Sequence, residues 1–214
     1  MTTVIAFVSQ KGGVGKSTLS RALAREASAS GMKVKIADLD TQQATCVDWN
    51  RTRLEKNIQP VIAVEVFGKA SEALKTAVQY ELFIIDGPAR ASAGTLEIAR
   101  VANLVVQPSG PSSDDLRPAI KEFHALVKAG IPKKKLVFAM SRMGTPVEEA
   151  TAREYIEDAG YEVLEGCLYE RPAYRQAHNS GRAVTETYYK NLNDQADALI
   201  QALIDRVGED GGFI

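Results

Sequence analysis

The chain has 214 residues, of which 45% are hydrophobic and 25% are charged, values typical of a globular protein with a substantial core. Its 26 basic and 27 acidic side chains nearly cancel, which excludes a polycation that binds nucleic acid or anionic lipid over its whole surface. Cys46 and Cys167 show no C-x-x-C spacing and no nearby histidine partner, so we expect two buried or idle thiols rather than a zinc site, redox pair or disulfide.

We expect neither a signal peptide nor a membrane-spanning segment in this sequence. No apolar run approaches the roughly 18 residues of a membrane span, and the N-terminal MTTVIAFVS lacks the basic start and cleavage region of a signal peptide. We therefore expect a cytoplasmic protein without a membrane partner. We expect one domain over residues 1–207 and a flexible tail over residues 208–214.

Short apolar runs typical of buried strands recur along the chain. They cover residues 3–9, 33–38, 61–66, 82–86, 103–108, 135–141 and 163–169. Residues with helical spacing of apolar side chains lie between them, and Gly31, Gly130 and Gly160 stand where helix C-caps belong. Strands that are apolar on both faces and alternate with helices predict an α/β fold with a doubly wound, mostly parallel sheet flanked by helices.

The stretch SQKGGVGKST, residues 9–18, follows the first predicted strand and opens the first predicted helix. Its glycines let the backbone curl so that N–H groups point inward, and the helix adds the positive end of its dipole. Lys16 would reach the β- and γ-phosphates of a nucleotide, and the Ser17 hydroxyl would bind Mg²⁺. The stretch departs from the usual phosphate-loop pattern at Gln10, in place of the first glycine, and carries a second lysine, Lys11.

Three aspartates follow predicted strands. Asp38 and Asp40 lie in ADLDTQ, and Asp86 lies in FIIDGP. Ligands of a doubly wound sheet bind beyond the carboxyl ends of its strands, and an aspartate after four apolar residues is typical of a Walker B element that binds Mg²⁺. Helix capping or simple solvation remains the alternative for Asp38 and Asp40.

KGGVGKS, DLDTQ and FIIDGP together resemble the deviant Walker A ATPases of the ParA/MinD family, most nearly the short ParA-type partition ATPases. Residues 105–116 and 170–186 resemble further family segments. The resemblance implies a P-loop NTPase fold with ATP and Mg²⁺ as cofactors. It implies nucleotide contacts from Lys11, Gly12, Gly13, Val14, Gly15, Lys16, Ser17 and Thr18, and from Arg142 and Pro172 towards the base.

The resemblance also implies roles. Family members extend the early lysine, here Lys11, across a dimer interface onto the phosphates of the partner's ATP, so two ATP molecules are held between two copies of the chain. Lys11, Lys16 and Asp40 would be catalytic, with Asp40 orienting the attacking water. Ser17, Asp38 and Asp86 would hold the metal.

At the level of biology, the resemblance implies a slow ATPase that a ParB-type or cargo-adaptor protein stimulates. The ATP-bound homodimer would bind DNA non-specifically on the nucleoid and so position a plasmid, a chromosomal region or a protein cluster. Two basic clusters are candidates for the DNA contact, residues 133–135 and the set Arg171, Arg175, Arg182 and Lys190. Solvated surface is the alternative for both.

Other readings differ in how well they fit the sequence. The acidic, glycine-rich end IDRVGEDGGFI argues against a MinD-like membrane helix, and the cysteines do not fit an iron–sulfur reductase. A small-molecule ligase or kinase on the same scaffold stays open, although it leaves Lys11 unexplained. His124 shares a predicted inward helix face with Ile120 and Phe123, so we expect a packed core histidine rather than a catalytic one.

Overall fold

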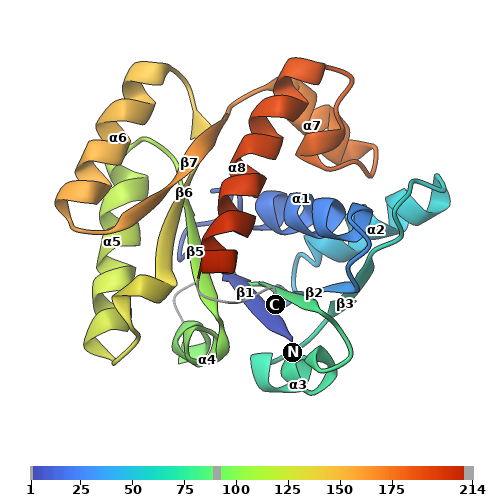
Figure 1. Ribbon diagram of the computed structural model, residues 1–214, viewed down its shortest axis with the longest axis horizontal. Coiled ribbons are helices and arrows are strands. Elements are labelled where there is room, and N and C mark those ends of the chain that lie inside the picture. Colours follow the sequence, from blue (N-terminus) through green and yellow to red (C-terminus); the bar gives the residue numbers. More distant parts are fainter. Residues whose placement is uncertain (1, 89–92, 210–214) are drawn as a thin grey trace.

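The computed structural model describes residues 2–88 and 93–209 (Figure 1). Within these ranges seven strands form one all-parallel sheet in the order β3-β2-β4-β1-β5-β6-β7. The strands are β1 Thr3–Phe7, β2 Val34–Asp38, β3 Ala63–Val66, β4 Leu82–Asp86, β5 Leu104–Ser109, β6 Leu136–Met143 and β7 Glu162–Tyr169. The predicted doubly wound α/β fold is confirmed.

Helices connect the strands. They are α1 Lys16–Ala29, α2 Thr45–Glu55, α3 Ala70–Ala77, α4 Ala93–Val101, α5 Ser113–Lys128, α6 Pro146–Asp158, α7 Pro172–Asn179 and α8 Lys190–Glu209, with 3-10 turns η1 Lys133–Lys135 and η2 Val184–Glu186. Gly208 and Glu209, which we expected in the tail, still belong to α8, and the rest of the predicted tail lies outside the described residues. None of the helices in the described ranges is both long and apolar enough to cross a bilayer.

Two hydrophobic cores lie on opposite faces of the sheet. One contains apolar side chains of α1, α2, α7 and α8, and the other contains those of α3, α4, α5 and α6. In Figure 1, α5 and α6 lie together to the left of the sheet, and α1, α2 and α7 lie to its right. The central strands face helices on both sides and are buried along their whole length, as in Leu82–Asp86, whereas the edge strands β3 and β7 are only partly buried.

The glycine loop follows β1, the strand at which the order of strands in the sheet reverses direction. After β1 the chain runs through β2 to β3 on one side, returns to β4, and then continues on the other side of β1 with β5. The carboxyl end of β1 is therefore a topological switch point, where ligands of such sheets bind. In register, Asp38 of β2 pairs with Asp86 of β4, which pairs with Phe7 of β1.

Helix α5 corrects one prediction. His124, expected in the core, is exposed, and its Nδ1 lies 2.8 Å from the hydroxyl oxygen of Tyr161. Ile120 and Phe123 are buried as expected, but the polar side chain on the inner face of the helix is Glu122 rather than His124.

Candidate functional site

The loop between β1 and α1 has the conformation that a cradle for an anion needs. Gly13 and Gly15 have φ values of 76° and 113°, in the left-handed region that disfavours side chains. A Cβ on Gly15 would also lie 2.6 Å from the Ser141 hydroxyl oxygen. Gly12 and Gly13 are exposed at the tip, while Val14 is buried and anchors the loop.

Lys16 lies inside this loop. It is buried, and its Nζ lies 3.4 Å from the carbonyl oxygen of Lys11, to which it donates. Burial lowers the pKa of Lys16, whereas the nearby charges of Asp86, Asp40 and Glu122 act in the opposite direction. An ammonium that is poorly solvated and aimed at a loop carbonyl is ready to exchange that weak contact for a phosphate oxygen.

Glu122 of α5 binds the start of the glycine loop, a role that the sequence analysis did not predict. Its Oε2 accepts hydrogen bonds from the Gln10 backbone N–H at 3.3 Å and from the Gln107 side-chain amide at 3.0 Å. Burial raises the pKa of Glu122, although these two hydrogen bonds and the charge of Lys16 oppose the rise. The first residue of the unusual loop motif, Gln10, is thus tied to helix α5 through a buried carboxyl group.

Lys11 points away from the loop interior in which the Lys16 side chain lies. Its Nζ lies 2.5 Å from Oδ1 of Asp115 in α5, and 44% of its side chain is exposed. Burial alone would raise the pKa of Asp115, but the hydrogen bonds from Lys11 and Ser112 bring it below its usual value. The two lysines of the loop therefore face different surroundings, one the loop interior and the other its outer edge.

The acidic residues meet at the carboxyl ends of β2 and β4. Asp38 accepts hydrogen bonds from the backbone N–H groups of Asp40, at 3.0 Å, and Cys46, at 2.9 Å. The Cys46 thiol donates to Oδ2 of Asp86 at 3.1 Å. Next to them, the hydroxyl of Thr45 donates to that of Ser17 at 3.1 Å. The predicted metal residues are brought together, and Cys46, buried as expected but not idle, lies among them.

The electrostatics of this cluster favour a cation. Burial and the charge of Asp86 raise the pKa of Asp38 to about 6, and burial raises that of Asp86. Oδ1 of Asp86 is buried and has no hydrogen-bond partner within the described residues. Carboxylate and hydroxyl oxygens are the ligands that Mg²⁺ prefers, so Ser17, Asp38 and Asp86 fit this ion.

Asp40 lies at the rim of the cluster. Its side chain is half-buried, and its Oδ1 accepts hydrogen bonds from the backbone N–H groups of Gln42, at 3.3 Å, and Gln43, at 3.1 Å. These contacts cap the turn that leads to α2 and leave its other carboxylate oxygen for a ligand. The capping interpretation thus has a structural counterpart, and the role of Asp40 at the nucleotide stays a prediction.

A hollow of about 260 Å³ lies beside the loop, lined by Gly13, Gly15 and Thr18 and by residues of β6, β7 and α7. Arg142 also lines it, donating from Nη1 to the Gly13 carbonyl oxygen at 3.1 Å. Arg142 has a φ of 59°, an unusual conformation for an arginine, which turns the chain at the end of β6. Pro172 begins α7 and lines a separate neighbouring hollow.

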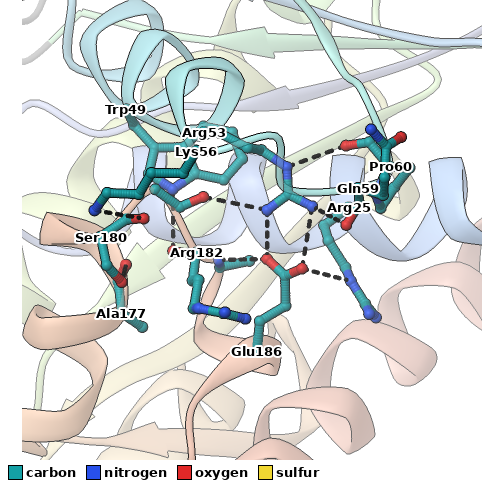
Figure 2. Close-up of polar contacts among 12 residues, drawn as sticks. Arg25, Trp49, Arg53, Lys56, Gln59, Pro60, Ala177, Ser180, Arg182 and Glu186 are labelled. Carbon is teal, nitrogen blue, oxygen red and sulfur yellow. Dashed lines mark hydrogen bonds and ion pairs between the residues drawn. The ribbon is translucent and has the colours of Figure 1, made fainter.

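Helix α2 carries Cys46 near its first turn and is fixed near its other end by Arg53 (Figure 2). The Arg53 guanidinium is fully buried and makes two hydrogen bonds to Glu186, of 2.6 and 3.1 Å. It also donates to the carbonyl oxygens of Gln59, Pro60 and Gly181. This network joins α2 to the segment before α8 and so fixes the helix whose start completes the acidic cluster.

A strand, a glycine loop that opens a helix, and acidic residues at two neighbouring strand ends define a P-loop nucleotide-binding domain. The model of one such family, described as CbiA, the CobQ/CobB/MinD/ParA nucleotide binding domain, matches residues 5–185. The chain belongs to this family, and the predicted resemblance is confirmed.

Individual relatives agree with this assignment. Maintenance of carboxysome distribution protein A of Gloeobacter kilaueensis is 27% identical over 195 residues, which are 89% of this chain and 88% of that protein. Protein ParA of Rhizobium radiobacter is 25% identical over 221 residues, covering 96% and 98%. The solved structure of the septum site-determining protein MinD from Pyrococcus horikoshii, complexed with Mg-ADP, has a TM-score of 0.76 at 17% identity and covers 97% of this chain and 98% of that one.

Proposed function

We propose that this chain is an ATPase switch of the ParA type that dimerises around ATP and positions a cargo in the cell. The cargo would be plasmid or chromosomal DNA, or a protein cluster. Membership of the MinD/ParA family supports the nucleotide and the reaction. The positioning role is supported by two relatives, one named ParA and one named for the maintenance of carboxysome distribution.

One observation carries the proposal, namely the opposite directions of the two loop lysines. Lys16 is buried within the loop, whereas Lys11 is half-exposed at its outer edge and pairs with Asp115. A second cation that cannot serve the nucleotide of its own loop is available to the nucleotide of another chain. ATP then joins two copies, because the γ-phosphate meets Lys11 only in the dimer, and ADP releases them.

In this proposal ATP and Mg²⁺ are the cofactors. The N–H groups of residues 12–15 and the ammonium of Lys16 hold the phosphates, while Ser17, Asp38 and Asp86 hold the metal. When bound, Mg²⁺ neutralises charge on the β- and γ-phosphates. The free Oδ1 of Asp86 and the buried Lys16 are the observations that support this arrangement.

Thr18, Arg142 and Pro172 extend the proposed site away from the phosphates. Thr18 borders the hollow beside the loop and would donate to the α-phosphate. Arg142 lines the same hollow, and it would face the nucleoside. Pro172 begins the helix on the far side, so its contact with the base would need the nucleotide to reach the edge of the hollow.

Asp40 would orient the attacking water, and its replacement tests this role. An Asp40→Ala protein should hydrolyse ATP roughly 10²-fold more slowly, since a positioned base contributes at least this much, and should accumulate as the ATP dimer. Phosphate release and size-exclusion chromatography measure the two effects. Asp48→Ala is the control, because Asp48 is an exposed acid of the same segment paired only with Arg51 in the described structure, at 3.2 Å. Unchanged turnover in Asp40→Ala would remove Asp40 from the mechanism.

The DNA contact of the dimer is best supported at the C-terminal basic cluster. Arg182 lies 5.5 Å from the ring of Tyr188, whose side chain is 85% exposed. Arg182 itself is half-buried, whereas Arg175 and Lys190 are exposed and make surface ion pairs with Glu170 and Asp194. Exposed cations with exposed aromatic rings suit the phosphates and sugars of a nucleic acid, and such surface pairs are easily exchanged.

The lysine cluster 133–135 is less suited to this contact. Lys133 Nζ lies 4.8 Å from the ring centre of Tyr161, and Lys135 Nζ donates to the Ala102 carbonyl oxygen at 2.8 Å. The ammonium groups of Lys133 and Lys135 are therefore engaged within the chain. In the cell, the ATP dimer would associate with the nucleoid through the C-terminal cluster, and a ParB-type or cargo-adaptor protein would trigger slow hydrolysis and release.

A gel shift on random-sequence DNA, with ATP, with ADP and without nucleotide, tests the proposal. ATP alone should retain the DNA, because only the dimer joins two basic clusters. A dimer that neutralises about six phosphates should lose roughly 10³-fold in affinity between about 50 and 200 mM salt. Retention that is independent of nucleotide would contradict the switch. ATP turnover that depends on a small-molecule acceptor would instead support the ligase or kinase alternative.

A further inference from the structure

We infer that Asp38, Cys46 and Asp86 form a binding site for a thiophilic divalent cation such as Zn²⁺ in the nucleotide-free protein. One candidate ligand atom from each of these residues lies within 4.8 Å of the other two, and all three side chains are buried. The site belongs to the chain without ATP, so the inference does not depend on dimerisation or hydrolysis. It adds a sulfur ligand to residues that otherwise offer only oxygen.

The spacing of the ligand atoms is close to that of a tetrahedral site. Zn²⁺ lies about 2.3 Å from a thiolate sulfur and about 2.1 Å from a carboxylate oxygen, so two such ligands are about 3.6 Å apart in a tetrahedron. Cys46 Sγ and Asp86 Oδ2 are already 3.1 Å apart. Three protein ligands leave a fourth position for water, as in the zinc sites that keep an open position.

A free ligand atom is present in addition to the cluster itself. Asp86 is 2% exposed, and its Oδ1 has no hydrogen-bond partner in the part of the chain that the structure describes. Arg21 approaches the cluster, but its Nη2 donates to the Thr45 carbonyl oxygen at 2.5 Å. The charges of Lys16 and Arg21 offset part of the negative charge at Asp86 but leave its Oδ1 without a hydrogen bond in the described residues, so a dication could still bind that oxygen directly.

The thiol determines which ions are preferred. Mg²⁺ binds oxygen ligands and gains little from sulfur, whereas Zn²⁺, Cd²⁺ and Co²⁺ form strong bonds to a thiolate. On binding, the Cys46 proton that now lies towards Asp86 passes to solvent, and the sulfur takes the ion instead. Because the ion also engages Asp38 and Asp86, it would compete with Mg·ATP for the same carboxylates.

The chain offers a matched control in its other cysteine. Cys167 is also buried and also donates to a carboxylate, Oε2 of Glu149, at 2.9 Å. That carboxylate is already paired with Arg153 at 2.9 Å and accepts a hydrogen bond from Tyr169. Cys167 therefore has the thiol–carboxylate contact of Cys46, but among the described residues it belongs to no cluster of three candidate metal ligands.

The test is a titration of untagged, nucleotide-free protein with Co²⁺, followed by the near-ultraviolet absorption that a thiolate–cobalt bond produces, and then by displacement with Zn²⁺. Wild type and Cys167→Ser should show the absorption, and Cys46→Ser should not. Cys46→Ser should also weaken zinc binding by more than the roughly 10- to 100-fold that loss of an outer-shell partner costs. Thermal unfolding of each variant verifies that it is folded.

Asp38→Asn keeps the thiol and removes one ligand, so it should weaken the cobalt absorption while leaving Cys46 in place. Wild-type protein without the absorption, or a Cys46→Ser protein that keeps it, would overturn the inference. An absorption lost in Cys167→Ser would assign the metal to the other cysteine and would overturn it as well. None of these outcomes depends on ATP, so a failure here is distinct from a failure of the proposed switch.

Discussion

A Lys11→Ala protein should bind ATP as a single chain with nearly unchanged affinity and should no longer form the ATP-dependent dimer. Lys16, which lies inside the loop, keeps its place at the nucleotide of the same chain, while the phosphates of the partner lose a cation delivered across the interface. Such cations contribute roughly 10³ to 10⁵ in rate to phosphoryl transfer, so partner-stimulated hydrolysis should fall by about 10³ or more. A fluorescent ATP analogue measures binding, and light scattering in an Asp40→Ala background measures the dimer.

The Lys11→Ala substitution should leave the free energy of unfolding nearly unchanged. The ion pair that Lys11 makes with Asp115 joins side chains that are 44% and 15% exposed, and exposed pairs stabilise by at most about 1 kcal/mol. Asp115→Ala is the matched control, because it breaks the same pair but keeps the lysine, and its dimer should form. Lys16→Ala differs from both in losing nucleotide binding. A Lys11→Ala protein that dimerises normally with ATP would contradict the shared site.

The fold could be predicted because its signal is local. Most strands of the sheet appear in the sequence as short apolar runs. A strand that is buried on both faces does not alternate apolar and polar residues, so the run itself marks the strand. The phosphate loop could be predicted for the same reason. Its tight turn needs residues with positive φ that are close together in the chain, and Gly13 and Gly15 meet this need. Gly31, Gly130 and Gly160 likewise have positive φ where helices end.

What the sequence could not show is contact between side chains that are distant along the chain. Arg53 and Glu186 are separated by 133 positions, and Cys46 and Asp86 by 40, and neither pair has a spacing that distinguishes it. The exposure of His124 was missed for a different reason. One turn of the helix offered both Glu122 and His124 as the inner polar residue, and only the need of Gln10 and Gln107 for an acceptor decides between them.

The Arg53→Met substitution should cause the largest loss of stability among the changes considered. Figure 2 shows the guanidinium between Glu186 and the carbonyl oxygens of the loop after α2. Without it, Glu186 stays buried with only Arg25, 3.3 Å away, as an ion-pair partner in the described structure. Removing one partner of a buried ion pair costs about 3 to 5 kcal/mol, and because Arg25 still offsets part of the Glu186 charge we expect the lower part of this range. The melting temperature should then fall by roughly 10 °C in a chain of this size.

A second variant distinguishes the loss of the Arg53–Glu186 charge pair from a simple loss of packing. Methionine fills much of the arginine's volume, so a double variant, Arg53→Met with Glu186→Gln, removes the charge imbalance and should recover a large part of the lost stability. Arg51→Ala, two residues away, should change stability by less than about 0.5 kcal/mol, because its side chain is 66% exposed. Calorimetric unfolding of the four proteins measures the difference. Arg53 also packs over the ring of buried Trp49, with its guanidinium carbon 5.5 Å from the ring centre. If the single and double variants were equally unstable, this packing rather than the Arg53–Glu186 charge pair would hold α2 in place.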